Sequence, residues 1–186
     1  GRASLIAREG LILAGLFVFK RVFTEVDSDI VFEEFFKDGE FVPEGRQICL
    51  VSGLLQHILT AERTALNFLQ RMSGIASQTR KYADQLEGLK TQVLDTRKTT
   101  PGLRLLEKKA VEFGGGTNHR MGLYDMIMLK DNHVDFAGGI NQAIRKTLKY
   151  LQKKERHLKI EIEVRNFDEI REVLDIGGID RILLDN

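Results

Sequence analysis

The sequence predicts an α/β fold in which an N-terminal α/β (α+β) domain is followed by an incomplete parallel α/β barrel. Short apolar segments separated by turn signals fill the first third of the chain, which favours a small sheet. From about residue 91 onward, strand-like and helix-like segments alternate, which is typical of parallel βα units in a barrel or a doubly wound sheet. We therefore expect two domains, at residues 1–75 and 76–186.

The N-terminal domain is expected to begin with strands. Two apolar segments separated by a Glu-Gly turn, and a third that follows a turn-rich stretch, predict strands at residues 4–8, 11–19 and 47–52. From Thr60 to Ala76 the apolar residues then recur at helical spacing, with Thr60 as the expected N-cap. This long helix would link the two domains.

In the second domain, four short apolar segments predict strands at residues 92–95, 126–129, 160–164 and 182–184. Helical periodicity between them predicts helices at residues 103–113, 137–152 and 167–174. Each strand ends in, or is followed by, charged or strongly polar residues, which are Arg97, Lys98, Lys130, Asp131, Asn132, His133, Glu163, Asp185 and Asn186. Because the carboxyl ends of parallel strands converge on one rim, we expect these groups to form a site.

His119 and Arg120 do not fit this pattern directly, because they precede the strand at 126–129 and would lie at the opposite rim. We expect residues 115–119 to form a short extra strand, which would return the pair to the rim of the site. The glycines at 114–116 have two readings, a helix C-cap with its turn, or a backbone that approaches a ligand closely. The second reading favours a functional role for His119 and Arg120.

Lys130 and the carboxylates of the strand at 160–164 are the sharpest candidates for chemistry. A lysine that ends an apolar strand reaches the surface or meets an anion, and it can also serve as a Schiff-base nucleophile. The arginines around it favour anion binding. Glu161 and Glu163 share one face of a strand that a parallel sheet covers on both sides, so they need a metal, ribose hydroxyls or lysines as partners.

Composition excludes several classes of protein. With 28 Lys and Arg against 27 Asp and Glu, and with no aromatic residues interleaved among the basic ones, nucleic-acid binding is not expected. The longest apolar segment, residues 11–19, is too short to span a membrane. Cys49 is the only cysteine, which fits a reducing compartment, so we expect a cytoplasmic protein. The spacing of the histidines matches no zinc site.

Several long stretches, in order and at matching spacing, resemble the quinolinate phosphoribosyltransferase (nicotinate-nucleotide pyrophosphorylase, carboxylating) family. They are LTAERTALNFLQRMSGIAS, DTRKTTPGLR, EKKAVEFGGGTNHRMGLYDMIMLKDNH, IEIEV and ILLDN, and the resemblance runs from about Arg8 to Asn186. It implies an N-terminal α/β domain followed by an incomplete α/β barrel. It also implies that quinolinate and phosphoribosyl pyrophosphate are converted, with Mg²⁺, to nicotinate mononucleotide, pyrophosphate and carbon dioxide in NAD biosynthesis.

The resemblance also implies roles for individual residues. Quinolinate would be bound by Arg97, His119, Arg120 and Lys130, and Lys98 would lie at the phosphoribosyl end. Glu163 and Asp185 would hold the ribose hydroxyls and the magnesium, with Asn186 beside them, so that Lys98, Glu163 and Asp185 form the catalytic set. Arg63, and with a looser match Arg8, would enter the site of a partner subunit. This implies a homodimer with shared active sites, with a higher oligomer left open.

Two alternatives remain open. One is a relative of the same fold that acts on another aromatic acid. The other is a non-catalytic fragment, because members of the family continue well beyond the ILLDN stretch with which this sequence stops. The combination of Arg63, Arg97, His119, Arg120 and Lys130 favours a dicarboxylate substrate. The resemblance does not assign a role to His133.

Overall fold

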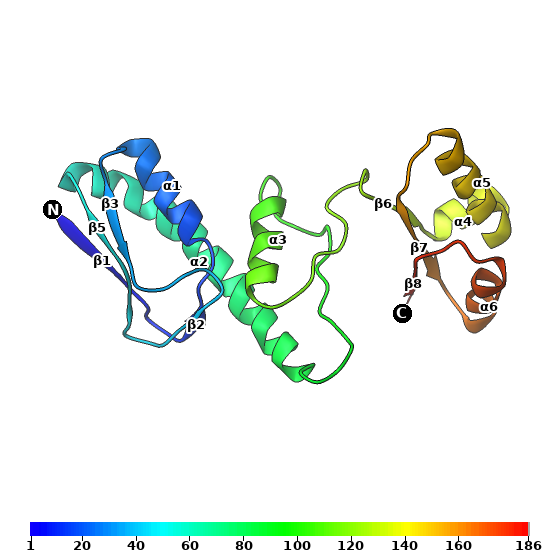
Figure 1. Cartoon of the computed structure of the whole chain (residues 1–186), viewed down its shortest axis with the longest axis horizontal. Coiled ribbons are helices and arrows are strands. Elements are labelled where there is room, and N and C mark those ends of the chain that lie inside the picture. Colours follow the sequence, from blue (N-terminus) through cyan, green and yellow to red (C-terminus); the bar gives the residue numbers. More distant parts are fainter. Residues whose placement is uncertain (186) are drawn as a thin grey trace. The chain divides into compact units, whose positions relative to one another are not determined.

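The computed structural model describes residues 1–185, which form two compact units, residues 1–119 and the chain from Arg120 onward (Figure 1). Both units mix helices and strands, and the second contains parallel strands, as the sequence predicts. The division into domains 1–75 and 76–186 stays a prediction.

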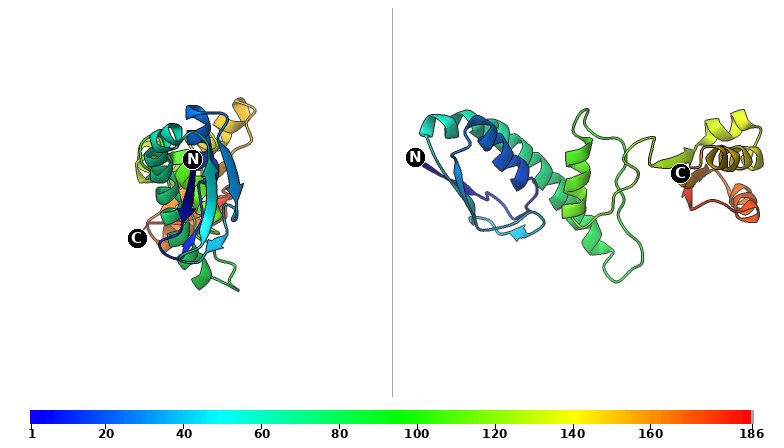
Figure 2. Two further views of the ribbon diagram at one scale, coloured as in Figure 1. Left: turned by 90° about the vertical axis from the view of Figure 1, so that its left-hand side faces the viewer. Right: turned by 45° about the horizontal axis from the view of Figure 1, so that its top comes forward.

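An antiparallel sheet forms the N-terminal part of the first unit. Its order is β1 (Arg2–Ile6), β5 (Gln47–Ser52) and β3 (Val31–Glu34), and a separate pair joins β2 (Leu11–Ile12) to β4 (Phe41–Val42). The strand predicted at residues 47–52 is confirmed as β5, the central strand of this sheet. The helices α1 and α2 lie together on one face of the sheet, as the right-hand view of Figure 2 shows.

The helix α1 (Leu16–Val26) replaces most of a predicted strand. Residues 11–19 form a strand only at Leu11–Ile12, and the chain turns helical from Leu16. The reason is periodicity: Leu16, Phe19 and Phe23 recur at helical spacing and are each 2% exposed in the core of the first unit. A short apolar run does not by itself distinguish a strand from a buried helix.

The 31-residue helix α2 (Leu55–Gln85) is longer than predicted at both ends. Thr60 is not its N-cap. It lies inside the helix, where its hydroxyl donates to the Gln56 carbonyl at 2.8 Å. The helix starts earlier because Ile58, which is 2% exposed, packs in the same core as Ala61 and Ala65. Burying one such aliphatic side chain stabilises a fold by about 1.5–3 kcal/mol.

The C-terminal half of α2 supports the helix α3 (Arg104–Phe113), which begins one residue after its predicted start. Ala76 of α2 and Ala110 of α3 are both fully buried in one cluster with Met72. Small residues on both helices allow their backbones to approach closely. This contact fixes the place of α3 within the first unit.

The second unit is a parallel sheet in the order β6 (Met126–Leu129), β7 (Lys159–Val164) and β8 (Arg181–Leu184). Three helices cover the sheet on one side, as both figures show: α4 (Asp131–Ala137), α5 (Ile140–Lys153) and α6 (Phe167–Ile176). Helices on one side only are typical of a barrel rather than of a doubly wound sheet.

One helix of the second unit differs from its prediction. The helix predicted at residues 137–152 begins only at Ile140, and a separate short helix, α4, precedes it. Gly138 and Gly139 divide the two because their φ angles are +95° and +116°, values that a continuing helix does not have. Within residues 1–185, no helix has the length and apolar character that crossing a membrane requires.

Candidate active site

A single parallel bridge joins two segments that the sequence predicts to be short strands, residues 92–95 and 115–119. Leu94 pairs with Thr117, and backbone hydrogen bonds of 2.8 and 3.2 Å tie Thr117 to the partner segment. Among the described residues the pairing extends no further, so neither segment is a full strand. The bridge is nevertheless parallel, as the predicted extra strand requires, so the two segments leave it in the same direction.

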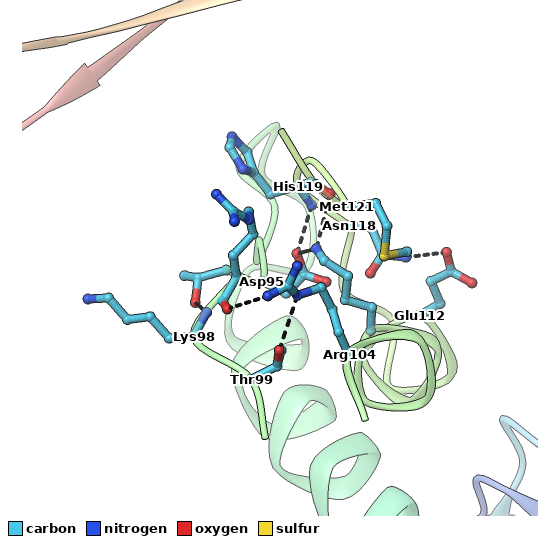
Figure 3. Close-up of polar contacts among 12 residues, drawn as sticks. Asp95, Lys98, Thr99, Arg104, Glu112, Asn118, His119 and Met121 are labelled. Carbon is cyan, nitrogen blue, oxygen red and sulfur yellow. Dashed lines mark hydrogen bonds and ion pairs between the residues drawn. The ribbon is translucent and has the colours of Figure 1, made fainter. Parts of the chain in front are cut away.

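Arg97, Lys98 and His119 therefore follow the same end of the bridge. Lys98 and His119 are labelled in Figure 3. Lys98 is exposed and Arg97 is half-buried. The Arg97 Nε is buried and has no hydrogen-bond partner within residues 1–185. An arginine in this state is suited to a carboxylate or phosphate supplied by a ligand, because its planar group can form two parallel hydrogen bonds.

Asp95 and Lys108 form a buried ion pair that the sequence analysis did not single out. The Lys108 side chain is 1% exposed and that of Asp95 is 8% exposed. The neighbouring Glu107 is also buried. The sequence offers a signal for Glu107 but not for the Asp95–Lys108 pair: Glu107 lies three residues before Ala110, on the apolar face of its helix, where an unpaired charge is costly.

The glycine run at 114–116 ends α3 and packs against α2. A Cβ atom on Gly114 would lie 2.5 Å from the Ala76 carbonyl oxygen, and one on Gly116 would lie 2.9 Å from the Thr79 side chain. Of the two readings of this run, the structural one therefore applies to Gly114 and Gly116. They allow α3 to end against α2, and they do not need a ligand to explain them.

In the second unit, a cation and a carboxylate at neighbouring strand ends form an ion pair. Lys130 directly follows β6, Glu163 lies near the end of β7, and the Lys130 Nζ is 3.4 Å from the Glu163 Oε2. The Glu163 side chain is 11% exposed, whereas that of Lys130 is 51% exposed. Lys130 is thus the partner that Glu163 was expected to need. Because the lysine side chain is half exposed, the ion pair is accessible to a ligand from the lysine side.

Glu161 and His133 have structural partners in the second unit. Glu161 is 1% exposed, and its Oε2 lies 3.4 Å from the Arg181 Nη1 at the start of β8. His133 lies in the first turn of α4, where its Nδ1 accepts the backbone N–H of Lys130 at 3.0 Å. His133 therefore helps to hold the turn on which Lys130 lies.

Arg120 lies beside the start of β6. Its Nη1 donates to the Met126 carbonyl at 3.4 Å, and its Nη2 is 3.2 Å from the Met128 Sδ. The loop between them is closed by Asp125, whose carboxylate accepts two backbone N–H groups at 2.6 and 2.9 Å. Burial raises the pKa of Asp125, but these hydrogen bonds outweigh burial, and its pKa is lower than usual.

The remaining candidates are exposed or lie outside the structure. Asp185 follows β8 and its N–H donates to the Val164 carbonyl at 3.0 Å, while Asn186 lies outside the described residues. Arg63 is exposed on the third turn of α2, and not on the first turn, where an N-cap at Thr60 would have put it. No hydrogen bond or ion pair engages it within residues 1–185. Arg8 is exposed beside a cavity of about 500 Å³ in the first unit.

The candidate residues thus fall into two groups, one in each unit. Arg97, Lys98 and His119 belong to the first unit. The second unit contributes Arg120, Lys130, Glu163 and Asp185. Their convergence on one substrate stays a prediction.

The side chains in the described part of the chain can meet the needs of Mg²⁺ only in part. Residues 1–185 contain no group of three or more His, Cys, Asp or Glu side chains that could hold a metal ion. Mg²⁺, however, usually takes only one or two carboxylates and completes its shell with water and substrate phosphates. Glu163 lies near the end of β7 and Asp185 directly follows β8, and these strands are neighbours, because Glu163 pairs with Leu183 in the sheet. These two residues fit such a site, and a metal cage made wholly of protein is not present in the described residues.

Two family models match the chain one after the other. The model described as "Quinolinate phosphoribosyl transferase, N-terminal domain" matches residues 1–73, and the model of the C-terminal domain matches residues 75–186. The chain is 44% identical to quinolinate phosphoribosyltransferase (decarboxylating) 2b of Nicotiana tabacum, covering 99% of this chain and 53% of that protein. It is also 44% identical to the chloroplastic nicotinate-nucleotide pyrophosphorylase (carboxylating) of Arabidopsis thaliana, covering 99% of this chain and 54% of that protein.

A solved structure agrees with these matches. The crystal structure of NadC from Streptococcus pyogenes superimposes with a TM-score of 0.94 at 45% identity, covering 100% of this chain and 64% of that chain. The chain spans about half the length of the curated relatives it matches. Over that span the family models, the sequence identity and the fold agree. The chain belongs to the quinolinate phosphoribosyltransferase family.

Proposed function

We propose that this protein transfers the phosphoribosyl group of phosphoribosyl pyrophosphate to the ring nitrogen of quinolinate, in NAD biosynthesis. Pyrophosphate and carbon dioxide leave, and nicotinate mononucleotide is the product. The observation that carries the proposal is the Arg97–Lys98 segment of a family member, where the Arg97 Nε has no hydrogen-bond partner within residues 1–185. A substrate with two carboxylates and a second substrate with phosphates both call for such cations.

Quinolinate would be held by its two carboxylates. In this proposal Arg97 and Arg120 each form charge-assisted hydrogen bonds with a carboxylate, His119 adds a further polar contact, and Lys130 completes the set. A hydrogen bond to a charged group contributes about 1.5–3 kcal/mol. Such contacts fix the ring so that its nitrogen faces the sugar, which removes the entropic cost of finding that geometry during reaction.

The transfer step needs no side-chain nucleophile. The bond between the ribose C1 and the pyrophosphate oxygen breaks, its electron pair leaves with pyrophosphate, and the ring nitrogen forms the new bond to C1. Positive charge develops on the ribose in between. In this proposal Glu163 and Asp185 stabilise that charge and accept hydrogen bonds from the ribose hydroxyls, and Lys98 binds at the phosphoribosyl end.

Loss of carbon dioxide follows from the same charge distribution. Ribosylation leaves the ring nitrogen positive, so the electron pair released at the adjacent ring carbon is stabilised when its carboxylate departs. A proton then takes the place of the carboxylate. The contribution of the protein is to hold the ring and exclude other geometries.

We also propose that Mg²⁺ is required. Glu163 and Asp185 would hold it together with oxygens of phosphoribosyl pyrophosphate, and the ion would neutralise charge on the departing pyrophosphate. The Lys130 ammonium, 3.4 Å from Glu163, would share that carboxylate with the ion.

The proposed assembly is a homodimer with shared sites. Arg63, exposed on α2 with no partner within residues 1–185, would enter the site of the second subunit, and Arg8 is a second candidate for that role. A higher oligomer built from such dimers is compatible with this arrangement. The proposed compartment is the cytoplasm, which the single, buried cysteine, Cys49, supports.

The test uses the protein expressed from its complete natural coding sequence. Carbon dioxide release from carboxyl-labelled quinolinate is measured together with nicotinate mononucleotide, with and without phosphoribosyl pyrophosphate and Mg²⁺. We expect release only when quinolinate, phosphoribosyl pyrophosphate and Mg²⁺ are all present, and none from a monocarboxylate such as nicotinate.

Glu163→Gln should lower turnover and alter the Mg²⁺ requirement while quinolinate affinity stays near that of the wild type. Lys149→Ala, an exposed lysine on α5, is the control and should change neither. Release without nicotinate mononucleotide, or turnover that favours another aromatic acid, would overturn the proposal.

A further inference from the structure

The helix α3 buries two opposite charges at consecutive positions. Glu107 is 8% exposed and Lys108 is 1% exposed, although the helix has only ten residues. Burial of a charged group costs several kcal/mol unless the group is paired and hydrogen-bonded. Consecutive residues of a helix point about 100° apart, so the two side chains reach different parts of the first unit.

Glu107 fastens the far end of the segment 95–100. Its Oε1 accepts from the Nε and Nη2 of Arg71, at 2.8 and 2.5 Å, and its Oε2 accepts the Thr100 N–H at 3.1 Å. The Arg71 Nη2 also donates to the Thr100 hydroxyl at 2.6 Å. Thr100 is therefore tied to α2 and α3 at the same time.

Lys108 fastens the near end of the same segment and, with it, His119. Its ammonium is paired with the Asp95 carboxylate and donates to the His119 carbonyl at 3.0 Å. The Asp95 Oδ1 accepts the His119 N–H at 2.8 Å. The two members of the pair thus bind both backbone polar groups of His119. Asp95 and His119 are labelled in Figure 3.

Arg97 and Lys98 lie between these two ends, and their side chains have few contacts that fix them. Lys98 is exposed, and the Arg97 Nε has no hydrogen-bond partner within residues 1–185. Arg104 also holds the middle of the segment 95–100. It donates to the Arg97 carbonyl at 3.5 Å and to the Thr99 hydroxyl at 3.2 Å. The direction of both cations is therefore set by the main chain.

We propose that Glu107 and Lys108 are positioning residues, which hold the main chain of segment 95–100 and of His119 so that Arg97, Lys98 and His119 meet the substrates. They touch no substrate themselves. The proposal rests on the proposed function, because the substrates named are quinolinate and phosphoribosyl pyrophosphate. Its physical basis is that a displacement of about 1 Å in a binding group can cost about 100-fold in rate.

The main variant neutralises the ion pair without leaving a buried charge, by combining Lys108→Met with Asp95→Asn. Removing one partner alone is strongly destabilising, whereas replacing both is often neutral. The matched control is Lys109→Met. Lys109 is the next residue on the same helix, but its side chain is 49% exposed and pairs with Glu112 at the surface.

We expect the neutralised variant to fold and to show a KM for quinolinate about 10-fold higher and a kcat about 10-fold lower than the wild type. For Lys109→Met, both the KM for quinolinate and the kcat should stay within about twofold of the wild-type values. A loss of folded protein would lower kcat and leave the KM for quinolinate unchanged, so the two causes are distinguishable. A folded variant with wild-type KM and kcat would overturn the proposal.

A second variant and a second measurement keep the test decisive. If the neutralised variant does not fold, Glu107→Gln replaces it, since this change removes a charge but keeps the shape of the side chain. The KM and kcat are measured as before, and wild-type values would again overturn the proposal. Amide hydrogen exchange is the second measurement and needs no substrate. Faster exchange at His119 in the neutralised variant, and not in Lys109→Met, supports the proposal. Unchanged exchange counts against it, even if the wild type proves not to act on quinolinate, an outcome that would separately refute the proposed function.

Discussion

Replacing Gly114 by alanine tests the close approach of α3 to α2, and the structure gives the size of the effect. Gly114 has a φ of −76°, so alanine is not strained by the backbone conformation. The added Cβ would lie 2.5 Å from the Ala76 carbonyl oxygen and 2.6 Å from the Thr79 Cβ. Ordinary contact begins at 3.4 Å, so the two helices would have to separate by roughly 0.9 Å.

That separation would loosen a fully buried contact. Ala76 and Ala110 are both 0% exposed, and a gap of about 0.5–1 Å forfeits roughly a quarter to a half of the dispersion energy of the atoms that face it. Overpacking of this kind costs about 1–3 kcal/mol. We therefore expect Gly114→Ala to lower the free energy of unfolding by about that amount, although alanine is the better helix former.

Gly74→Ala provides the matched control within α2. Apart from its chain neighbours and the nearby backbone of α2, no atom of residues 1–185 lies within 4 Å of a Cβ added at Gly74, so the substitution should stabilise the helix by about 0.5–1 kcal/mol. The two variants make the same chemical change but should shift the free energy of unfolding in opposite directions, so that their free energies of unfolding differ by about 1.5–4 kcal/mol. At about 2–4 °C per kcal/mol for a chain of this size, thermal melting and urea unfolding both resolve the difference. Equal stability of the two variants would refute the close-approach explanation of Gly114.

Three further predictions concern the site and its support. Arg97→Ala or Arg120→Ala should weaken quinolinate binding by about 1.5–3 kcal/mol and phosphoribosyl pyrophosphate binding much less; calorimetry with each ligand checks this, and equal losses would contradict the assignment. Arg63→Ala and Arg97→Ala should each be nearly inactive, while a mixture with exchanged subunits should recover roughly a quarter of the wild-type sites; confirmed exchange with no recovery would exclude an action of Arg63 across subunits. Burial raises the pKa of Glu107, but hydrogen bonds from Thr100 and Arg71 outweigh it and lower the pKa below 4.5. The stability that Glu107 contributes is therefore fully present above its unfolded pKa and is lost as the pH falls through its folded pKa, so the free energies of urea unfolding of the wild type and of Glu107→Gln should differ most at neutral pH, and the difference should shrink as the pH falls below the usual range of a glutamate.

The sequence predicted best those elements that are bounded by clear breaks. The strands at 47–52 and 126–129 are present with the predicted limits, because turn residues or charges stand at both ends of an apolar run. The segment at 11–19 was assigned to the wrong kind of element, since an apolar run of that length is compatible with both. The helix predicted at 137–152 starts too early, because the amphipathic periodicity continues across two glycines whose φ angles interrupt the helix.

The supporting part of the site was not predictable from spacing. Arg97, Lys98 and Lys130 could be selected because each follows an apolar segment in the sequence. Asp95 and Lys108 belong to different elements, and nothing in the sequence indicates that they meet in the fold. The cost of burying their charges is visible only once the neighbouring backbone is in place.

The helix α2 carries Arg63, for which a role in the partner's site is proposed, and Arg71, and the number of residues between them has a consequence if that role is correct. Arg63 is exposed, and Arg71 binds Glu107 beside the segment that holds Arg97. They are eight residues apart, which corresponds to about 12 Å along the helix. One inserted or deleted residue between them would turn one arginine about 100° around the helix relative to the other. We therefore expect working members of this family to differ in residue type between these positions but to keep the number of residues between them fixed.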